Sequence, residues 1–399
     1  MEDNRIYWLA LSLVQGVGAI LFKRLIEAFG SPRNVFEASP EALQQVDGVG
    51  AKTAHHIKTF FKTDILRKQL QLLEKHRVQI VTLSDSNYPE LLRNIFDPPP
   101  VLYVKGTFSE RDQLAVAVVG SRKSSSYGRL TAEKICLDLV SRGVTIVSGL
   151  ARGIDSFAHR GALKGGGRTI AVLGNGVDCI YPRENRRLYE AIVEKGAVIS
   201  EFPLGTPPDR KNFPVRNRII SGLSLGVVVV EAGDQSGALI TADQALEQGR
   251  EVLAIPGNVS SYTSRGTHRL IKQGAKLVET AEDILEELSL SRIGAGTQIQ
   301  PLLSNSSRSI PPHSPERKGM ISSSPFLKGL KGETTPPLED LTEDEKSVYA
   351  VIGSEPLHVD EIVHRLQRPA GFVLGVLMML EMKNKIKQLS GKMFIRNDF

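Results

Sequence analysis

Six short apolar runs, rich in β-branched residues, place the strongest constraint on the fold of this chain. They occupy 114–120, 144–149, 168–174, 197–200, 226–232 and 251–257. Their apolar residues are continuous rather than alternating, which is typical of strands buried on both faces. Helical segments such as YGRLTAEKICLDLVSRG and SGALITADQALEQG lie between them. This alternation predicts an α/β fold with a doubly wound parallel sheet and right-handed crossovers.

The rest of the chain predicts further domains. Its 399 residues exceed what one compact core usually holds. Residues 1–75 have apolar residues three and four apart, which predicts a helical domain before the α/β domain of 76–290. Residues 291–337 are rich in Ser, Pro and Gly without an apolar period, so we expect a flexible linker. A small domain at 338–399 follows it.

Composition excludes several classes of protein. No apolar run reaches the roughly 18–20 residues of a membrane span, and MEDNRIYWLA has no signal-peptide core. We therefore expect no membrane contact and a reducing, cytoplasmic location. Two cysteines, Cys136 and Cys179, cannot build a disulfide scaffold or a four-Cys zinc site, and their apolar surroundings predict buried thiols. The formal charge of +6 permits a polyanionic partner without requiring one.

The turn after the first run has the residues of an anion-binding loop. Ligands of such sheets bind at the carboxyl ends of strands. Here Gly120 permits a sharp turn, Ser121 offers a hydroxyl, and Arg122 and Lys123 add charge, which suits a phosphate group. The alternative is a structural turn with solvated charges. The turn matches neither GxGxxG nor the P-loop, so we expect no nucleotide cofactor.

The next turns carry further candidates but no catalytic motif. Gly149 and Arg152 lie in the second turn, and Arg183 follows the third. Asp155 is predicted to cap a helix, with His159 one turn further on. The pair could perform acid–base catalysis, although such pairs are more often structural. No nucleophile motif, HExxH or carboxylate cluster is present, so we expect no catalytic residue and no metal.

The segment DRKNFPVRNRIIS at 209–221 concentrates basic residues around an aromatic ring. The candidates are Arg210, Lys211, Phe213, Arg216, Asn217 and Arg218. In single-stranded nucleic acid binding, such charges track phosphates and the ring stacks on a base for about 1–3 kcal/mol. We expect Pro214 to hold the loop extended before a helix. Alternatively, Phe213 packs in the core. Arg216 and Arg218 could equally be structural, and Glu231 or Asp155 would then be their partners.

The N-terminal part contains two Gly-Val-Gly turns, at 16–18 and 48–50, each followed by a helical segment. The pattern resembles paired helix-hairpin-helix motifs, in which backbone N–H groups face a phosphate. Lys23 and Lys52 lie nearby. The alternative is that the glycines only let two helices pack closely, so DNA contact by this region stays open.

The C-terminal part predicts a winged helix. LTEDEKSVYAVIG begins with a Thr cap and has Glu345 three residues on, and two further helical segments follow. IKQLSGKMFIR then predicts two short strands around a Ser-Gly turn. The expected third helix, Ala370–Lys383, is mostly apolar and lacks a row of base-reading side chains, which favours protein contact.

Several motifs together resemble one family. VVGSRKSS, VSGLARGIDSFAHRGAL, AVLGNGVDCIYPREN, ISEFPLGTPP, FPVRNRIISGLS and EAGDQSGALITADQALEQGREVLAIPG follow in this order over about 150 residues. This looks like the DNA-processing protein A family, DprA, also called Smf. The resemblance implies an extended Rossmann-like fold that binds single-stranded DNA rather than a cofactor. It also implies a homodimeric mediator that protects incoming strands in natural transformation and loads the RecA recombinase.

The resemblance also assigns residues. The family's Gly-Ser-Arg turn, its basic residue and aromatic, and its RNR segment fall on Gly120, Ser121, Arg122, Arg210, Phe213, Arg216, Asn217 and Arg218. Arg210 departs from the family's usual Lys but keeps the charge. The family's self-association and RecA-contact surface would include Leu270 and Ile271 in this chain.

Two other functions compete with a DNA-binding mediator. One is a nucleotide-processing enzyme on a related Rossmann-like fold, such as a phosphoribohydrolase. Those enzymes carry a PGGxGTxxE motif, which is missing from EAGDQSGALITADQ at 231–244. The other is a duplex-binding regulator that uses the winged helix. We therefore expect a binding protein rather than an enzyme.

Overall fold

The computed structural model describes residues 3–288, 341–353, 357–366, 368, 370–383, 385–389 and 393–396. The predicted linker, 291–337, lies outside these residues. The chain divides into two compact units, Met1–Ser304 and Asn305–Phe399. None of the described helices is both long and apolar enough to cross a membrane.

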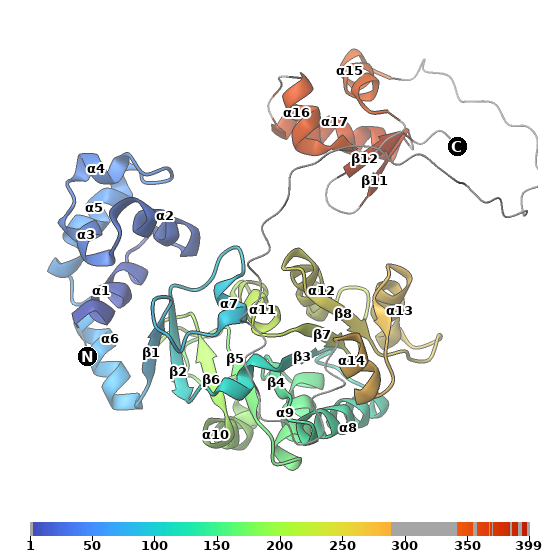
Figure 1. The fold of residues 1–399 in the computed structure, drawn as a ribbon, viewed down its shortest axis with the longest axis horizontal. Helices are drawn as coiled ribbons and strands as arrows, with labels where there is room; N and C mark the ends of the chain where they lie inside the picture. The colour runs from blue at the N-terminus through green and yellow to red at the C-terminus, as the bar shows by residue number, and fades with distance from the viewer. Residues whose placement is uncertain are drawn as a thin grey trace, which may run out of the picture. The chain divides into compact units, whose positions relative to one another are not determined.

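The first unit begins with a group of packed helices (Figure 1). They are α1 (Asp3–Ser12), α2 (Ala19–Phe29), α3 (Pro32–Glu37), α4 (Pro40–Gln44), α5 (Ala51–Thr59), the 3-10 turn η1 (Phe60–Lys62) and α6 (Ile65–His76). Helices α3 and α4 each start at a Ser-Pro pair, because the Ser hydroxyl accepts a backbone N–H bond and Pro suits the first helical position. The two Gly-Val-Gly turns precede α2 and α5, as the helix-hairpin-helix pattern predicts.

A nine-stranded sheet forms the centre of this unit, in the order β1-β2-β6-β5-β4-β3-β7-β8-β9. The strands are β1 (Gln79–Thr82), β2 (Val101–Gly106), β3 (Ala115–Val119), β4 (Thr145–Ser148), β5 (Thr169–Val172), β6 (Ala197–Ser200), β7 (Gly226–Val229), β8 (Glu251–Ala254) and β9 (Lys276–Leu277). The six predicted strands, β3 to β8, are confirmed and all pair in parallel. At one edge, β1 and β2, which were not predicted from the sequence, add as antiparallel strands.

Helices cover both faces of the sheet. Between and after the strands lie α7 (Glu90–Arg93), η2 (Glu110–Gln113), α8 (Ser126–Ser141), α9 (Ile154–Lys164), η3 (Arg183–Asn185), α10 (Arg186–Lys195), α11 (Asn212–Gly222), α12 (Gly237–Glu247), η4 (Tyr262–Ser264), α13 (Arg265–Lys272) and α14 (Ala281–Glu287). Helices α8, α9 and α14 pack on one face, and α11, α12 and α13 pack on the other.

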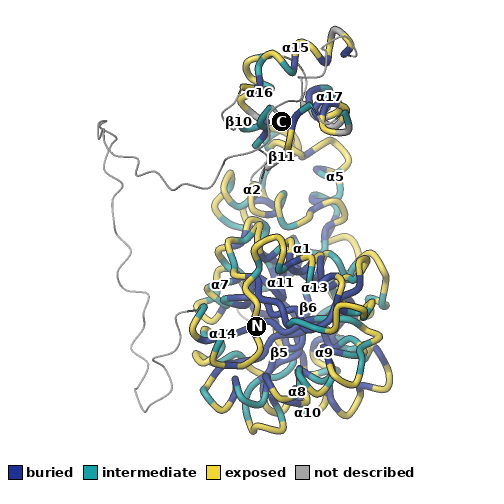
Figure 2. The backbone as a smooth tube through the Cα atoms, turned by 90° about the vertical axis from the view of Figure 1, so that its right-hand side faces the viewer, coloured by how far each residue is buried: buried dark blue, intermediate teal, exposed yellow. Residues whose placement is uncertain are grey.

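The buried strands explain why the apolar runs are continuous. In β3, Ala115, Ala117 and Val119 face the core under α11 and α12. Val116 and Val118 face the core under α8 and α9. Because successive side chains point to opposite faces, a strand with two cores needs apolar residues at every position. Figure 2 shows the strands as the buried centre of this unit, with exposed backbone around them.

The second unit has the element order of a winged helix. It contains α15 (Glu343–Val351), β10 (Leu357–His358), α16 (Val359–Leu366), α17 (Ala370–Met382), β11 (Ile386–Leu389) and β12 (Met393–Arg396). The predicted Thr cap is present, since Thr342 and Glu345 form a reciprocal capping box at the start of α15. Strands β11 and β12 pair as the predicted antiparallel hairpin, and β10 pairs with the other side of β12.

The two cysteines differ in their surroundings. Cys136 is fully buried in α8, and burial raises the pKa of its thiol. Cys179 is only half-buried, so the prediction of a buried thiol is wrong at this position. It lies in the turn after β5, where part of its surface stays accessible.

Candidate nucleic-acid interface

A pocket of about 600 Å³ lies at the carboxyl ends of the central strands. Its lining comes from the turn after β3, the turn after β7, the first residues of α11 and the segment around η4. Strands β3 and β7 are neighbours, yet the chain leaves β3 toward β4 on one side and leaves β7 toward β8 on the other. The pocket therefore lies at the point where the strand order reverses, which is where open α/β sheets bind ligands.

The turn after β3 is held by the neighbouring strand end. The Ser121 N–H donates to the Glu231 backbone oxygen at 2.7 Å. The buried Glu231 carboxylate accepts the Ser125 N–H at 2.8 Å and the Ser125 hydroxyl at 2.5 Å. These bonds fix the start of α8 beside β7. They leave Arg122 and Lys123, which are both exposed, at the mouth of the pocket.

Phe213 is the centre of a layered group of side chains. Its ring stacks on Tyr181 with centroids 6.0 Å apart, and the Arg122 guanidinium lies over the ring at 5.1 Å. Pro214 was expected in an extended loop, but α11 already begins at Asn212. Proline is tolerated there because N–H groups of the first helical turn have no partner within the helix. Phe213 is half-buried and lines the pocket, so the alternative of a wholly buried ring is not what the structure shows.

Arg216, in α11, lines the pocket but is buried, with only 3% of its surface exposed. Its guanidinium donates to the backbone oxygens of Gly149, at 2.8 Å, and Val172. A side chain at position 149 would meet the guanidinium at about 2.6 Å, which is why glycine is required there. Burial lowers the pKa of Arg216 to about 10, while Asp155 opposes that shift, so the side chain stays charged at neutral pH.

Arg218 points away from the pocket. Its guanidinium donates to Asp97 at 2.8 Å and to both oxygens of Glu201 at 3.1 and 2.7 Å. Its side chain is 9% exposed. The partners considered from the sequence, Glu231 and Asp155, are therefore not those of Arg218. Because its donors are used within the protein, we do not assign Arg218 a phosphate contact.

Asp155 and His159 are structural rather than an acid–base pair. His159 is completely buried, its Nδ1 lies 2.7 Å from the Thr169 hydroxyl, and burial lowers its pKa to about 3. The imidazole is therefore neutral at physiological pH. Asp155 lies in the first turn of α9, and its carboxylate accepts the Ala151 N–H at 3.3 Å. The helix cap itself is Gly153, so the predicted capping role of Asp155 is wrong.

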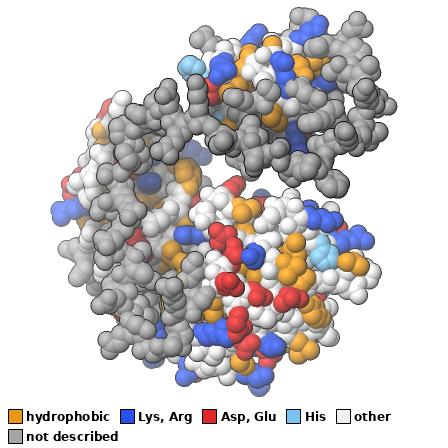
Figure 3. Space-filling model, turned by 45° about the vertical axis from the view of Figure 1, so that its right-hand side comes forward, with side chains coloured by type: hydrophobic (Ala, Val, Ile, Leu, Met, Phe, Trp, Pro, Cys, Tyr) orange, Lys and Arg blue, Asp and Glu red, His pale blue; other side chains and the backbone are white. Residues whose placement is uncertain are grey.

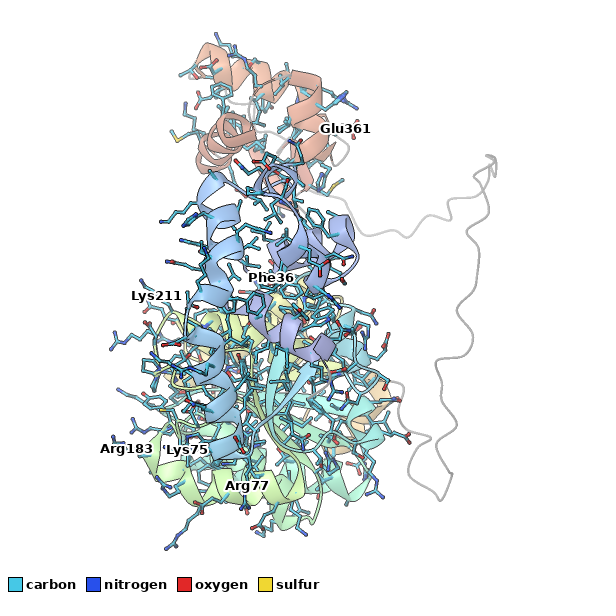
Figure 4. All side chains as sticks on the ribbon, turned by 90° about the vertical axis from the view of Figure 1, so that its left-hand side faces the viewer. Phe36, Lys75, Arg77, Arg183, Lys211 and Glu361 are labelled. Atoms are coloured by element: carbon cyan, nitrogen blue, oxygen red, sulfur yellow. The ribbon has the colours of Figure 1, made fainter. Side chains whose placement is uncertain are left out.

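The remaining residues predicted to bind DNA are spread around the edge of the pocket, which we call the rim. Asn217 lines the pocket and donates its amide to the Gly237 backbone oxygen at 3.3 Å. Arg152 pairs with Glu184 at the surface. Arg183 and Lys211 lie outside the pocket, and Figure 4 shows both projecting from the side of the unit along which α6 runs. Helix α6 is joined to this rim by Gln69, which exchanges two hydrogen bonds with the Leu204 backbone.

The two residues predicted at an interface differ in exposure. Leu270 is 4% exposed and belongs to the core between α13 and the sheet. Ile271 packs only partly against that core. Within this chain, Ile271 therefore has accessible side-chain surface and Leu270 has almost none.

Four cations around the pocket lack acidic partners. Within the described residues, no carboxylate lies within ion-pair distance of Arg122, Lys123, Arg210 or Lys211, and all four side chains are exposed. Figure 3 shows a face of the molecule on which Asp and Glu side chains gather among scattered Lys and Arg. An exposed row of uncompensated cations beside stacked aromatic rings can hold a chain of phosphates and the flat face of a base.

Sequence reasoning missed the part of the pocket lining that comes from η4. Gly233, Gln235 and Ser236 line it from the turn after β7, and Tyr262 and Thr263 line it from η4. Tyr262 lies five residues beyond the Pro-Gly turn that ends β8, in a segment without a recognisable motif. Among the described residues, no group of three or more His, Cys, Asp or Glu side chains has the arrangement of a metal site.

The fold and the pocket together define a class: a Rossmann-like domain between a helix-hairpin-helix region and a winged helix, with a basic, aromatic binding edge. Comparison with known families agrees. The chain matches the family model of DNA recombination-mediator protein A over residues 79–289. It matches the DprA winged helix domain over 332–392 and a helix-hairpin-helix motif over 7–70.

Individual relatives extend over nearly the whole chain. Protein Smf of Synechocystis sp. is 38% identical over 402 residues, which is 99% of each chain. Protein Smf of Escherichia coli is 40% identical and covers 88% of this chain and 85% of its own. The crystal structure of DNA processing protein A (DprA) from Streptococcus pneumoniae has a TM-score of 0.62 and 39% identity, and covers 72% of this chain and 98% of its own. This chain belongs to the DprA/Smf family.

Proposed function

We propose that this protein binds single-stranded DNA along the carboxyl edge of its sheet and acts as a recombination mediator. The observation that carries the proposal is the pocket at the β3–β7 reversal, with unpaired cations around the Phe213 stack. Stacking on an aromatic ring needs an exposed base face, and a duplex hides those faces within its own stack. The edge is therefore suited to a single strand.

Family membership supports the wider role. A recombination mediator of this family would protect a single strand and load the RecA recombinase onto it, in natural transformation or DNA processing. It would act in the cytoplasm as a homodimer. Ile271 on α13 is our candidate for a contact with a second copy or with RecA, since Leu270 is used in the core.

The test compares a labelled oligothymidine with a duplex of the same length by fluorescence anisotropy. We expect tight binding of the single strand and loss of that binding in an Arg122→Ala/Arg210→Ala double variant. Both side chains are exposed and free of ion pairs, so the variant should keep its fold. Duplex preference, or binding unaffected by both changes, would move the DNA site away from the pocket. Turnover of a nucleoside monophosphate by the wild type would instead favour a phosphoribohydrolase-like enzyme.

Phe213→Ala should weaken oligothymidine binding by about 1–3 kcal/mol, the usual contribution of one stacked base. The ring also contacts Tyr181 and the Arg122 guanidinium, so its loss removes both of those contacts as well. Anisotropy measures the effect, and a thermal melt identifies variants that have lost their fold. Wild-type affinity in a folded variant would assign the ring a packing role only.

A further inference from the structure

Tyr262 exposes a large aromatic ring on a wall of the pocket that the Phe213 stack does not reach. It is the first residue of η4, and 58% of its surface is exposed. Phe213 lies against Gly174, just beyond β5, whereas Tyr262 lies against Gly233, just beyond β7. In the sheet order β5-β4-β3-β7, these strands are three spacings apart, or about 14 Å. The two rings therefore pack on the ends of different strands.

The Tyr262 ring is held in place although it is exposed. A side chain at position 233 would lie about 2.5 Å from the ring, so the ring packs directly on the Gly233 backbone. Two backbone hydrogen bonds of Ala232, the residue before Gly233, join the turn after β7 to the segment that carries Tyr262. The Ala232 N–H donates to the Thr263 oxygen and the Gly266 N–H donates to the Ala232 oxygen, both at 2.7 Å. A rigid ring loses little conformational freedom when a ligand stacks on it.

A cation accompanies this ring, as one accompanies Phe213. The Arg265 guanidinium lies 5.7 Å from the Tyr262 ring centroid, and the Arg122 guanidinium lies 5.1 Å from that of Phe213. The Arg265 side chain is 60% exposed, and its contact with Asp234 is long, at 3.8 Å. Such an exposed pair contributes little to stability, so the guanidinium remains able to bind a phosphate.

We propose that Tyr262 and Arg265 form a second base-stacking subsite, which takes a different nucleotide of the same single strand from the one at Phe213. The subsite deepens the proposed single-stranded DNA binding and rests on it. One strand then crosses the β3–β7 reversal, with a base on an aromatic ring and a phosphate near an arginine at each end of the pocket. Sequence-tolerant binding follows, because every base has a flat face.

The first experiment measures oligothymidine affinity in Tyr262→Ala, Tyr262→Phe and Phe96→Ala variants. Loss of one stacked base predicts about 5- to 150-fold weaker binding for Tyr262→Ala. Tyr262→Phe should bind like the wild type, because it keeps the ring. Phe96 is the matched control: it is 80% exposed and does not line the pocket, so its removal should leave affinity unchanged.

The second experiment uses Tyr262→Trp as a reporter of stacking. The only natural tryptophan, Trp8, is 6% exposed in α1 and should give a constant signal. Oligothymidine should quench the emission of the new tryptophan, and an oligomer of abasic sites should not. Two results would overturn the second subsite: wild-type affinity of Tyr262→Ala, or no quenching of the new tryptophan. If Phe213→Ala still weakened binding in that case, the proposed function would stand. Failure of the wild type to bind single strands would overturn both.

Discussion

Replacing Arg216 by Ala should lower the free energy of unfolding by about 3–5 kcal/mol, the cost of removing one partner from a buried charged group. The guanidinium donates to the Gly149 and Val172 backbone oxygens, so it joins the ends of β4 and β5. It is also the main charge that favours the ionised form of Asp155, whose own burial raises its pKa. Without Arg216, the buried Asp155 carboxylate loses its main opposite charge, and two buried carbonyls lose a hydrogen-bond donor.

Chemical denaturation measures this loss, with Arg210→Ala as the control. Arg210 is exposed six residues earlier in the chain, and surface changes of this kind usually stay within about 0.5 kcal/mol. Arg216→Lys should also be destabilised, because an ammonium lacks the planar fork of a guanidinium. A folded Arg216→Ala protein of wild-type stability that no longer binds DNA would show instead that Arg216 contacts a phosphate.

Oligothymidine affinity should fall steeply with salt in the wild type and much less steeply once the four unpaired cations around the pocket are neutralised. About four phosphate contacts, at about −0.7 each, predict a slope near −3 in log affinity against log salt. Affinity should therefore drop about 1000-fold for each tenfold rise in salt. The slope should fall to about −0.7, the contribution of one remaining contact at Arg265, in a variant that carries Gln at Arg122, Lys123, Arg210 and Lys211.

A matched variant separates this effect from net charge. It removes the same number of exposed cations outside the pocket, with Gln at Arg111, Lys134, Lys164 and Lys195. This control should keep the wild-type slope, because counterions are released only where the side chains meet phosphates. A shallow slope in the wild type, or equal slopes in both variants, would contradict phosphate binding at the rim.

Most of the sheet could be predicted because its signals are local. Strands β3 to β8 are continuous apolar runs, and a strand buried on both faces requires that pattern. The antiparallel edge formed by β1 and β2 could not be predicted from such a local signal. The strand Gln79–Thr82 pairs with β2, and this partner is chosen by pairing across the chain rather than by the strand's own composition.

The binding edge was predicted in part. Gly120, Ser121 and Arg122 were recognised because the turn after a buried strand of a parallel sheet lies at the ligand edge. The basic segment after β6 was recognised as a group, but its members have different roles. Arg210 and Lys211 are exposed before α11, whereas Arg216 and Arg218 lie within the helix and are buried.

The sequence by itself determined the class of fold, the position of the ligand edge and the residue types that gather there. Apolar periodicity and turn residues determine structure over a few neighbouring positions, so they can be recognised in the sequence alone. Only the tertiary structure decided which cations face solvent, because α11 packs on the sheet beside α12 and turns Arg216 inward. It also brought Tyr262 beside Gly233, since contacts between distant segments depend on how the strands are ordered.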